Sequence, residues 1–272
     1  MTDKICVVVP WHNEEQIAKF LDAWALPISE MASPSLDWLV LQRDLDKEGC
    51  AVTKNKGVRA AMERGADIVV ILDDDCFPEM HQIPLGVPAS ELLPRFAKRH
   101  ADCLQPQPVT MYLPVTDPPS RGTPFRERTV KLPVAASMGF WTDVGDYDAP
   151  SQLVHGATKP MEFRREPQML HYFSLCGMNL AFRPKDWLPW CEFIDVPRFD
   201  DIWMGWLWQR EAYRRGYCFN LNGPLVRHSR QSNVWKNLEH EARWLETSET
   251  LWRKIATHQP GDYATLRGLL PV

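Results

Sequence analysis

Three short apolar runs in the first 75 residues predict strands. Residues 5–9 form a continuous apolar run that ends at Pro10, which is typical of a strand buried on both faces of a sheet. Residues 38–41 and 68–72 repeat the pattern, the last as Ile-Val-Val-Ile-Leu. We therefore expect three buried parallel strands near the amino terminus.

Two amphipathic stretches lie between these runs and predict helices. Asn13 is a favourable N-cap, acidic residues follow it, and apolar side chains then recur at helical spacing up to Trp24. Residues 53–64 form the second stretch, with Gly65 as its stop. Alternating strands and helices predict a parallel sheet with crossover helices. The absence of a GxGxxG motif argues against a dinucleotide site.

The remainder of the chain is less regular. Residues 78–125 are rich in proline, with one helix expected near 90–100, and we interpret them as loop and edge structure between two halves. An amphipathic helix is expected at 201–216 and a helical tail at 235–256. The whole pattern is that of an α/β protein.

Composition narrows the class of protein. The 272 residues are 44% hydrophobic and 24% charged, with a net charge of -4, so the overall basic surplus of a sequence-independent nucleic-acid binder is absent. No segment approaches the roughly 20 apolar residues of a membrane span, and no signal-peptide pattern opens the chain. Seven scattered cysteines form no CxxC pair, which indicates reduced thiols and a cytoplasmic location.

Three consecutive acids, Asp73, Asp74 and Asp75, directly follow the third apolar run. Ligands of open α/β sheets bind at the carboxyl ends of strands, where three crowded carboxylates repel one another. Mg²⁺ and Mn²⁺ favour oxygen ligands, commonly one or two carboxylates together with substrate phosphates. The triplet therefore predicts a divalent-cation site, with a solvated acidic turn as the alternative.

A second acidic pair, Asp200 and Asp201, stands at the start of the later helix, close to Trp203. Such acids either cap the helix or bind sugar hydroxyls and act on a leaving group. His228 follows an apolar pair, and a lone histidine in that place is structural unless acids converge on it. The 12 tryptophans either pack in the core or offer a platform for a sugar or base.

Two further groups of residues leave two interpretations open. Lys54, Lys56 and Arg59 lie on the second predicted helix and are either a solvated face or neighbours of a diphosphate. The small residues of Cys176–Asn179 permit close approach of the backbone to a ligand, and the same residues serve tight packing.

Six segments, taken in order, resemble the reversibly glycosylated polypeptides, a family that includes the UDP-arabinopyranose mutases and belongs to the GT-A class of glycosyltransferases. The segments are Val7–Pro10, Ile71–Phe77, Gly145–Leu153, Cys176–Phe182, Phe199–Trp206 and His228–Asn233. The resemblance implies a GT-A-like, Rossmann-type, mostly parallel sheet flanked by helices, with an elaborated second half. It implies one domain over 1–272 that comprises a nucleotide-binding half (1–77), a sugar or acceptor half (125–240) and a helical tail (241–272).

The resemblance also implies a UDP-sugar substrate and Mn²⁺ or Mg²⁺ as cofactor, held by Asp73, Asp75 and His228. Mutases of this family are reversibly glycosylated on an arginine after a Pro-Phe pair, which makes Arg128 the first candidate and Arg126 the second. The catalytic candidates are therefore Arg128, Arg126, Asp200 and Asp201. The candidates for nucleotide-sugar binding are Pro10, Asp44, Lys54, Lys56, Asp74, Asp146, Asp148, Cys176, Gly177, Asn179 and Trp203.

Three functions are open at this point. The first is interconversion of UDP-arabinopyranose and UDP-arabinofuranose, with the metal neutralising the leaving UDP. The second is a glycosyltransferase that passes the sugar to a separate acceptor, which is a metabolite, a polysaccharide or a modified DNA base. The third is a non-catalytic subunit that binds a nucleotide sugar.

Two departures from the family pattern bear on this choice. The chain stops soon after residue 256, and the sequence around Arg128 differs from the usual Leu-Arg-Glu-Gly. Both weaken the inference of mutase activity more than that of UDP-sugar binding. No membrane partner is expected, nucleic acid enters solely as an acceptor, and homo-oligomerisation is left open.

Overall fold

The computed structural model describes residues 3–111, 116, 118, 120–124, 128–156, 168–169, 171–229, 233–257 and 263–270. Their main feature is an eight-stranded sheet in the order β2-β1-β3-β9-β7-β10-β4, with β8 paired to β10. The strands of this sheet are β1 (Ile5–Trp11), β2 (Leu39–Arg43), β3 (Ile68–Leu72), β4 (Cys76–Pro78), β7 (Val134–Asp143), β8 (Gln168–Met169), β9 (Asn179–Phe182) and β10 (Cys218–His228).

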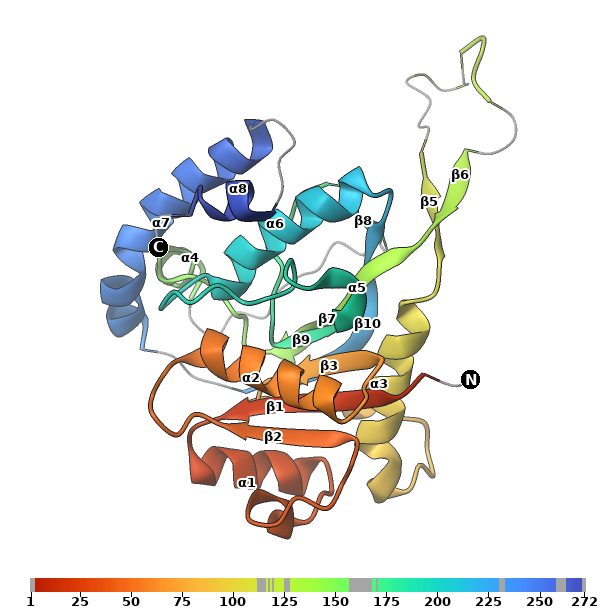
Figure 1. The fold of residues 1–272 in the computed structure, drawn as a ribbon. Helices are drawn as coiled ribbons and strands as arrows, with labels where there is room; N and C mark the ends of the chain where they lie inside the picture. Colours follow the sequence, from red (N-terminus) through yellow and green to blue (C-terminus); the bar gives the residue numbers. More distant parts are fainter. Residues whose placement is uncertain are drawn as a thin grey trace.

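Helices and short 3₁₀ turns connect and cover these strands (Figure 1). The α-helices are α1 (Glu14–Ala23), α2 (Cys50–Glu63), α3 (Leu92–Cys103), α4 (Ala149–His155), α5 (Pro184–Trp187), α6 (Asp200–Arg214), α7 (Val234–Thr257) and α8 (Tyr263–Arg267). The 3₁₀ turns are η1 (Ile28–Met31), η2 (Met80–Gln82) and η3 (Ala89–Glu91). In the described ranges, no helix is both long enough and apolar enough to cross a bilayer.

Most long strands run in one direction. β1 is parallel to both β2 and β3, and β10 is parallel to β7. β9 is antiparallel to its neighbours β3 and β7, so β7 and β10 point the same way as β1, β2 and β3. The carboxyl ends of these five strands therefore meet at one edge of the sheet. The predicted α/β class, with a mostly parallel sheet flanked by helices, is confirmed.

The alternation of side chains along the strands builds two apolar layers. On β1, Cys6 and Val8 belong to one layer with α2 and α6, while Val7 and Val9 belong to the other with α1 and α3. Helices therefore cover both faces of the sheet, as Figure 1 shows. This arrangement accounts for the unbroken apolar runs, because a strand buried on both faces has no polar side to alternate with.

The predicted helices are present with small shifts of their ends. Asn13 caps α1 and accepts hydrogen bonds from the amides of Glu15 and Gln16. The helices expected at 53–64, 90–100, 201–216 and 235–256 correspond to α2, α3, α6 and α7. The proposed division of the chain into nucleotide, sugar and tail parts stays a prediction, and so does the cytoplasmic location.

A two-stranded ribbon, β5 (Gln107–Thr110) with β6 (Thr129–Leu132), stands apart from the main sheet. It projects from the body at the end where β6 leads into β7 (Figure 1). That end is the amino end of β7, opposite the edge at which the carboxyl ends of the main strands meet.

A buried polar network joins α3 to three strands near the middle of the sheet. His100 Nε2 lies 2.7 Å from Asn179 Oδ1, and His100 Nδ1 lies 3.2 Å from Ser137 Oγ. Asn179 Nδ2 donates to the carbonyl of Pro224 at 2.9 Å. Gly139 lets these groups meet, because a Cβ there would lie 2.3 Å from Asn179 Nδ2. The network fixes the packing of β7, β9 and β10, which carry the site described next.

Candidate active site

The acidic triplet lies at the carboxyl end of β3, where a tight turn reverses the chain into β4. The amide of Asp73 donates to the carbonyl of Met178 at 3.0 Å, and the amide of Cys76 donates back to the carbonyl of Asp73 at 3.0 Å. β4 then pairs with β10, with Cys76 opposite His228. This pairing brings the triplet and His228 together across about 150 residues of sequence.

Asp75 and His228 face each other at the centre of the site. His228 Nε2 lies 3.6 Å from Asp75 Oδ2, and both side chains are largely buried. His228 Nδ1 lies 2.9 Å from the carbonyl of Val144, which must accept a proton from it. Burial by itself lowers the pKa of His228, but the Asp75 carboxylate outweighs this and raises the pKa to about 9. The carboxylate of Asp75 therefore favours a positive charge at Nε2 of His228.

Lys54 partners the first acid of the triplet. Its Nζ lies 3.0 Å and 3.1 Å from the two carboxylate oxygens of Asp73, and it also donates to the carbonyl of Gly177 at 3.2 Å. Burial raises the pKa of Asp73 to about 6, against the opposing charge of Lys54. Asp73, expected as a metal ligand, is thus ion-paired to a buried lysine in this structure.

Asp200 and Asp201 begin α6, and their charges act on Lys54. Asp201 Oδ2 accepts the amide of Gly177 at 2.7 Å, and Oδ1 accepts the amide of Ile202 at 2.8 Å. Asp200 Oδ2 is buried and has no hydrogen-bond partner within the described residues. Burial and the neighbouring Asp201 raise the pKa of Asp200 to about 7. Asp201 is structural in its contacts, whereas Asp200 can take up or release a proton near neutral pH.

Gly177 is needed for this packing. A Cβ at Gly177 would lie 2.4 Å from Phe193 Cε1 and 3.1 Å from Asp201 Cβ. In this structure the backbone at Gly177 thus packs closely against Phe193 and Asp201 of the protein itself. Cys176 is next to it, and its Sγ lies 3.9 Å from Asp146 Oδ2.

The carboxyl ends of β1 and β2 form a second part of the site. Pro10 and Trp11 end β1 and pair with Gln42 and Arg43 of β2. The Arg43 guanidinium lies 4.9 Å from the centre of the Trp11 ring, and Trp11 Nε1 is buried with no hydrogen-bond partner in the described ranges. The sequence patterns did not single out Trp11, and nothing but its place at a strand end could have done so.

Asp44 follows β2 and organises the loop after it. Its two oxygens accept the amides of Glu48 at 2.8 Å and Gly49 at 3.2 Å. Lys56, on the exposed side of α2, is ion-paired with Glu48. Arg59 is likewise exposed and pairs with Glu192, so of the three basic residues on this helix Lys54 alone points to the acids.

The remaining candidates near the triplet lie around its rim. The backbone carbonyl of Asp74 accepts a hydrogen bond from Gln16 Nε2 at 2.9 Å, which ties the triplet to α1. Asp146 is exposed in the loop after β7, and Asp148 caps α4 by accepting the amide of Ser151 at 2.8 Å. Gln16 is a contact that the sequence patterns did not reveal.

Two candidates for sugar binding are buried in the core. The side chain of Asn179 forms hydrogen bonds with His100 and with the carbonyl of Pro224. Trp203 is fully buried, packs against Trp244 at 5.7 Å and donates from Nε1 to Ser248 Oγ at 2.8 Å. Contact between Trp203 and a sugar would require α7 to move away.

Arg128, the first arginine candidate, is not at the triplet. Arg128 precedes β6 on the projecting ribbon, and its Nε donates to the carbonyl of Pro124 at 2.6 Å. β7 continues from the ribbon over ten residues, roughly 30 Å of strand, before it reaches the edge that holds Asp75 and His228. Arg126 lies outside the described residues.

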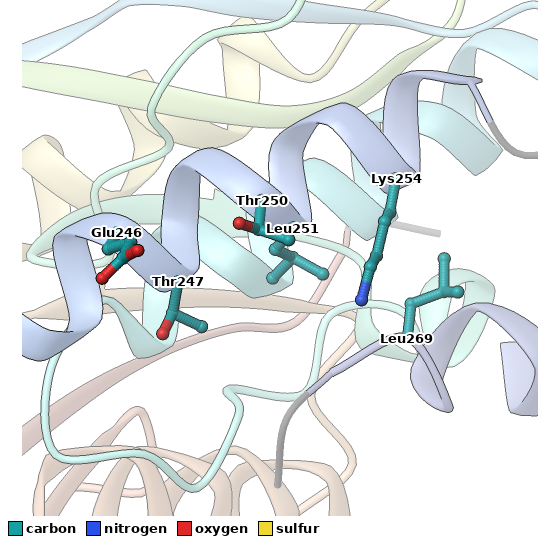
Figure 2. Close-up of a pocket in the computed structure, with 6 residues that line it drawn as sticks. All are labelled: Glu246, Thr247, Thr250, Leu251, Lys254 and Leu269. Carbon is teal, nitrogen blue, oxygen red and sulfur yellow. The ribbon is translucent and has the colours of Figure 1, made fainter.

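A cavity of about 280 Å³ lies elsewhere, between α7 and the segment around Leu269. Figure 2 shows Thr247, Thr250 and Lys254 of α7 along one wall, with Leu269 facing them. None of the residues that line this cavity belongs to the acidic site, so we assign it no role in the chemistry.

The acidic site fits a divalent cation with a partial set of protein ligands. Since the carbonyl of Val144 accepts the proton on Nδ1, Nε2 is the ring nitrogen that faces Asp75 at 3.6 Å, and a bound cation would take the place of the proton on it. Histidine ligands of metals are commonly held by a carbonyl in this way. Among the described residues no group of three or more His, Cys, Asp or Glu is arranged around a common point. Asp75 and His228 would therefore supply two ligands, as suits Mg²⁺ or Mn²⁺ shared with phosphates.

Comparison with known proteins decides the family. A model described as "Reversibly glycosylated polypeptide" matches residues 62–257, more than half of the chain. The chain belongs to the reversibly glycosylated polypeptide family. The sequence resemblance to this family is thereby confirmed.

The relatives of this family member include plant proteins. The probable UDP-arabinopyranose mutase 1 of Pisum sativum is 30% identical over 199 residues, which cover 67% of this chain and 52% of the pea protein. The probable UDP-arabinopyranose mutase 4 of Arabidopsis thaliana is 27% identical over 287 residues, which cover 92% of this chain and 77% of that protein. The chain spans about half the length of most of the UDP-arabinopyranose mutases that it matches.

Among solved structures, the mannosyltransferase PcManGT from Pyrobaculum calidifontis, in complex with GDP-Man and Mn²⁺, is similar with a TM-score of 0.45 and 14% identity. The match covers 99% of this chain and 69% of that chain.

Proposed function

We propose that this chain is a metal-dependent UDP-sugar enzyme that interconverts UDP-arabinopyranose and UDP-arabinofuranose. The family and the names of its relatives support the substrate class. The observation that carries the proposal is the pairing of Asp75 with His228 at the carboxyl edge of the sheet, 3.6 Å apart and with Nδ1 bound to a backbone carbonyl. Open α/β sheets bind nucleotides at this edge.

In this proposal Asp75 and His228 hold Mn²⁺ or Mg²⁺, which when bound neutralises charge on the leaving UDP. The carbonyl of Val144 keeps Nε2 of His228 directed at the site. Lys54 pairs with Asp73, which favours the ionised form of that acid, and it also holds the loop at Gly177 through its carbonyl. These contacts hold the acids in place before substrate arrives.

Asp200 is the group best suited to handle a proton. Its carboxyl is buried, Oδ2 lacks a hydrogen-bond partner within the described residues, and its pKa is raised to about 7 by burial and by Asp201. A group with a pKa near the working pH transfers protons efficiently. In the mutase proposal Asp200 exchanges a proton with a sugar hydroxyl while the ring opens and recloses.

The position of Arg128 favours a second candidate function, transfer of the sugar to a separate acceptor. A glycosylated intermediate on Arg128 of the same chain would have to bridge the length of β7, roughly 30 Å, in this conformation. In a transferase no such intermediate is required, and Asp200 would take the proton of an acceptor hydroxyl instead.

One chromatographic experiment separates these functions. The chain is incubated with UDP-arabinofuranose and Mn²⁺ without an acceptor, and the products are resolved by anion exchange. Appearance of the pyranose form supports the mutase. Release of UDP that accelerates when a sugar or polysaccharide acceptor is added supports the transferase. If neither occurs with any UDP-pentose or UDP-hexose, both are wrong and a non-catalytic subunit is the remaining function.

A further inference from the structure

A second cavity, of about 260 Å³, lies between the segment after β4, helix α3 and strand β10. Trp24 and Phe96 line it from the core and meet edge to face at 5.1 Å. Ile83, Val87 and Leu225 line it from the chain around η2 and from β10. Its walls are therefore mainly apolar, and none of the acids of the active site contributes to them.

Helix α3 adds three cations to the lining: Arg95, Lys98 and Arg99. Arg95 pairs with Glu91, the residue that precedes α3, and Lys98 pairs with Asp102 within α3; both pairs are exposed. Exposed pairs of this kind contribute little, so both cations can turn to another anion at small cost.

Arg99, the third cation of the lining, contacts Gln82. Its guanidinium donates to Gln82 Oε1 at 3.2 Å, and the same Oε1 accepts the amide of Leu225 at 3.0 Å. The acid among the lining residues is Glu79, whose carboxylate accepts hydrogen bonds from Thr142 Oγ1 and from the amide of His81. Arg95 and Lys98 are paired with acids and Glu79 is occupied by hydrogen bonds, so Arg99 is the cation of the lining that no carboxylate neutralises within the described residues.

We propose that this cavity binds a small amphipathic anion, an aromatic or short alkyl group that carries a carboxylate, sulfonate or phosphate. The apolar part would lie against Trp24 and Phe96, and the anionic head would meet Arg99 at the rim. Ligand pockets commonly combine apolar walls with a few placed polar groups and have volumes of roughly 300–1,000 Å³. The volume of about 260 Å³ lies just below this range, so the cavity suits a small ligand with one or two rings.

The cavity also contacts the strand that leaves the acidic triplet. Trp24 Nε1 donates to the carbonyl of Cys76 at 2.9 Å, and Cys76 stands next to Asp75 and opposite His228 in the β4–β10 register. Leu225 lies three residues before His228 on the same strand. An anion in the cavity would thus bind next to the two strands that position Asp75 and His228.

The test uses two ligands of equal shape, naphthalene-1-sulfonate and the neutral naphthalene-1-sulfonamide, in fluorescence titrations of the full chain at low salt. We expect one site, with the sulfonate bound at least about tenfold more tightly, because a charge-assisted contact is much stronger than a neutral one. This binding needs no sugar donor or metal, so its failure would leave the proposed enzymatic function untouched.

Variants locate the site. Arg99→Gln should reduce the affinity for the sulfonate to that for the sulfonamide, while Arg99→Lys should retain most of it. Val87→Trp should fill the cavity and abolish binding of both ligands. Arg253→Gln, an exposed arginine on α7, is the matched control and should bind as the wild type does. Equal affinity for the two ligands, unchanged binding by Val87→Trp, or no binding of the sulfonate at millimolar concentration would each overturn the proposal.

Discussion

Lys54 Nζ lies 3.0 Å from Asp73 Oδ1, and the lysine side chain is only 4% exposed. The pair joins α2 to the carboxyl end of β3 and lies beside Asp200 and Asp201, both of which influence the pKa of Lys54. Asp73 therefore serves first to neutralise a buried cation. This leaves Asp75 as the acid of the triplet that faces His228.

Removal of the lysine should destabilise the fold. We expect Lys54→Met to lower the free energy of unfolding by about 3 kcal/mol, because breaking a buried ion pair leaves an unpaired buried charge. Urea denaturation measures the loss, and the double variant Lys54→Met/Asp73→Asn should recover much of it. Lys56→Met, on the exposed side of the same helix, should change stability by less than about 0.5 kcal/mol. Equal losses for the two lysine variants would contradict the buried pair.

Gly177 should not tolerate a side chain. In Gly177→Ala the new Cβ would lie 2.4 Å from Phe193 Cε1, so we expect a loss of about 1–3 kcal/mol from overpacking. Phe193→Leu in the same background should restore part of it. Gly268→Ala is the control, because a Cβ there would have nearest contacts of 3.4 Å. A Gly177→Ala variant as stable as Gly268→Ala would show that the loop before β9 is looser than described.

His100 should make the stability depend on pH. Burial lowers the pKa of His100 from 6.5 to about 4 in the folded state, so the unfolded chain takes up the proton first. The stability it contributes is present above pH 6.5 and is lost as the pH falls toward 4, by about 3 kcal/mol in total. In His100→Gln this component of the pH dependence should vanish. Urea titrations of both proteins from pH 7 to pH 4 check it, and parallel curves would contradict the assignment.

Asp200 should matter for turnover and not for substrate affinity. We expect Asp200→Asn to bind UDP within about twofold of the wild type and to lose at least about 100-fold in kcat, because the amide cannot exchange the proton. Asp102→Asn, on the surface of α3, is the matched control. An unchanged kcat in Asp200→Asn would remove this residue from the mechanism.

The repeating elements of the fold follow from local patterns. The apolar runs that became β1, β2 and β3 are buried on both faces, and Asn13 caps α1, so each has a local physical cause. The antiparallel β9 and the pairing of β4 with β10 depend on contacts between distant segments. No pattern within one segment could have predicted them.

The same division holds for the site. The place of Asp75 in the site was predictable because it follows a buried strand, and that of His228 because its segment resembles a family motif. The ion pair of Lys54 with Asp73 was not predictable, since the helical pattern of α2 does not distinguish Lys54 from Lys56. The distance between Arg128 and the acids could not be predicted either. Arg128 was selected by its place after a Pro-Phe pair, but the direction of β7 decides at which edge of the sheet it lies.

The most direct test of the account is whether UDP binding requires a divalent cation held by Asp75 and His228. Isothermal titration of UDP is carried out with and without Mn²⁺ on the wild type, on Asp75→Asn and on His228→Gln. We predict that Mn²⁺ tightens UDP binding at least about tenfold in the wild type and has no effect in either variant. UDP that binds the wild type equally well without metal, or variants that keep the full effect of Mn²⁺, would contradict the account.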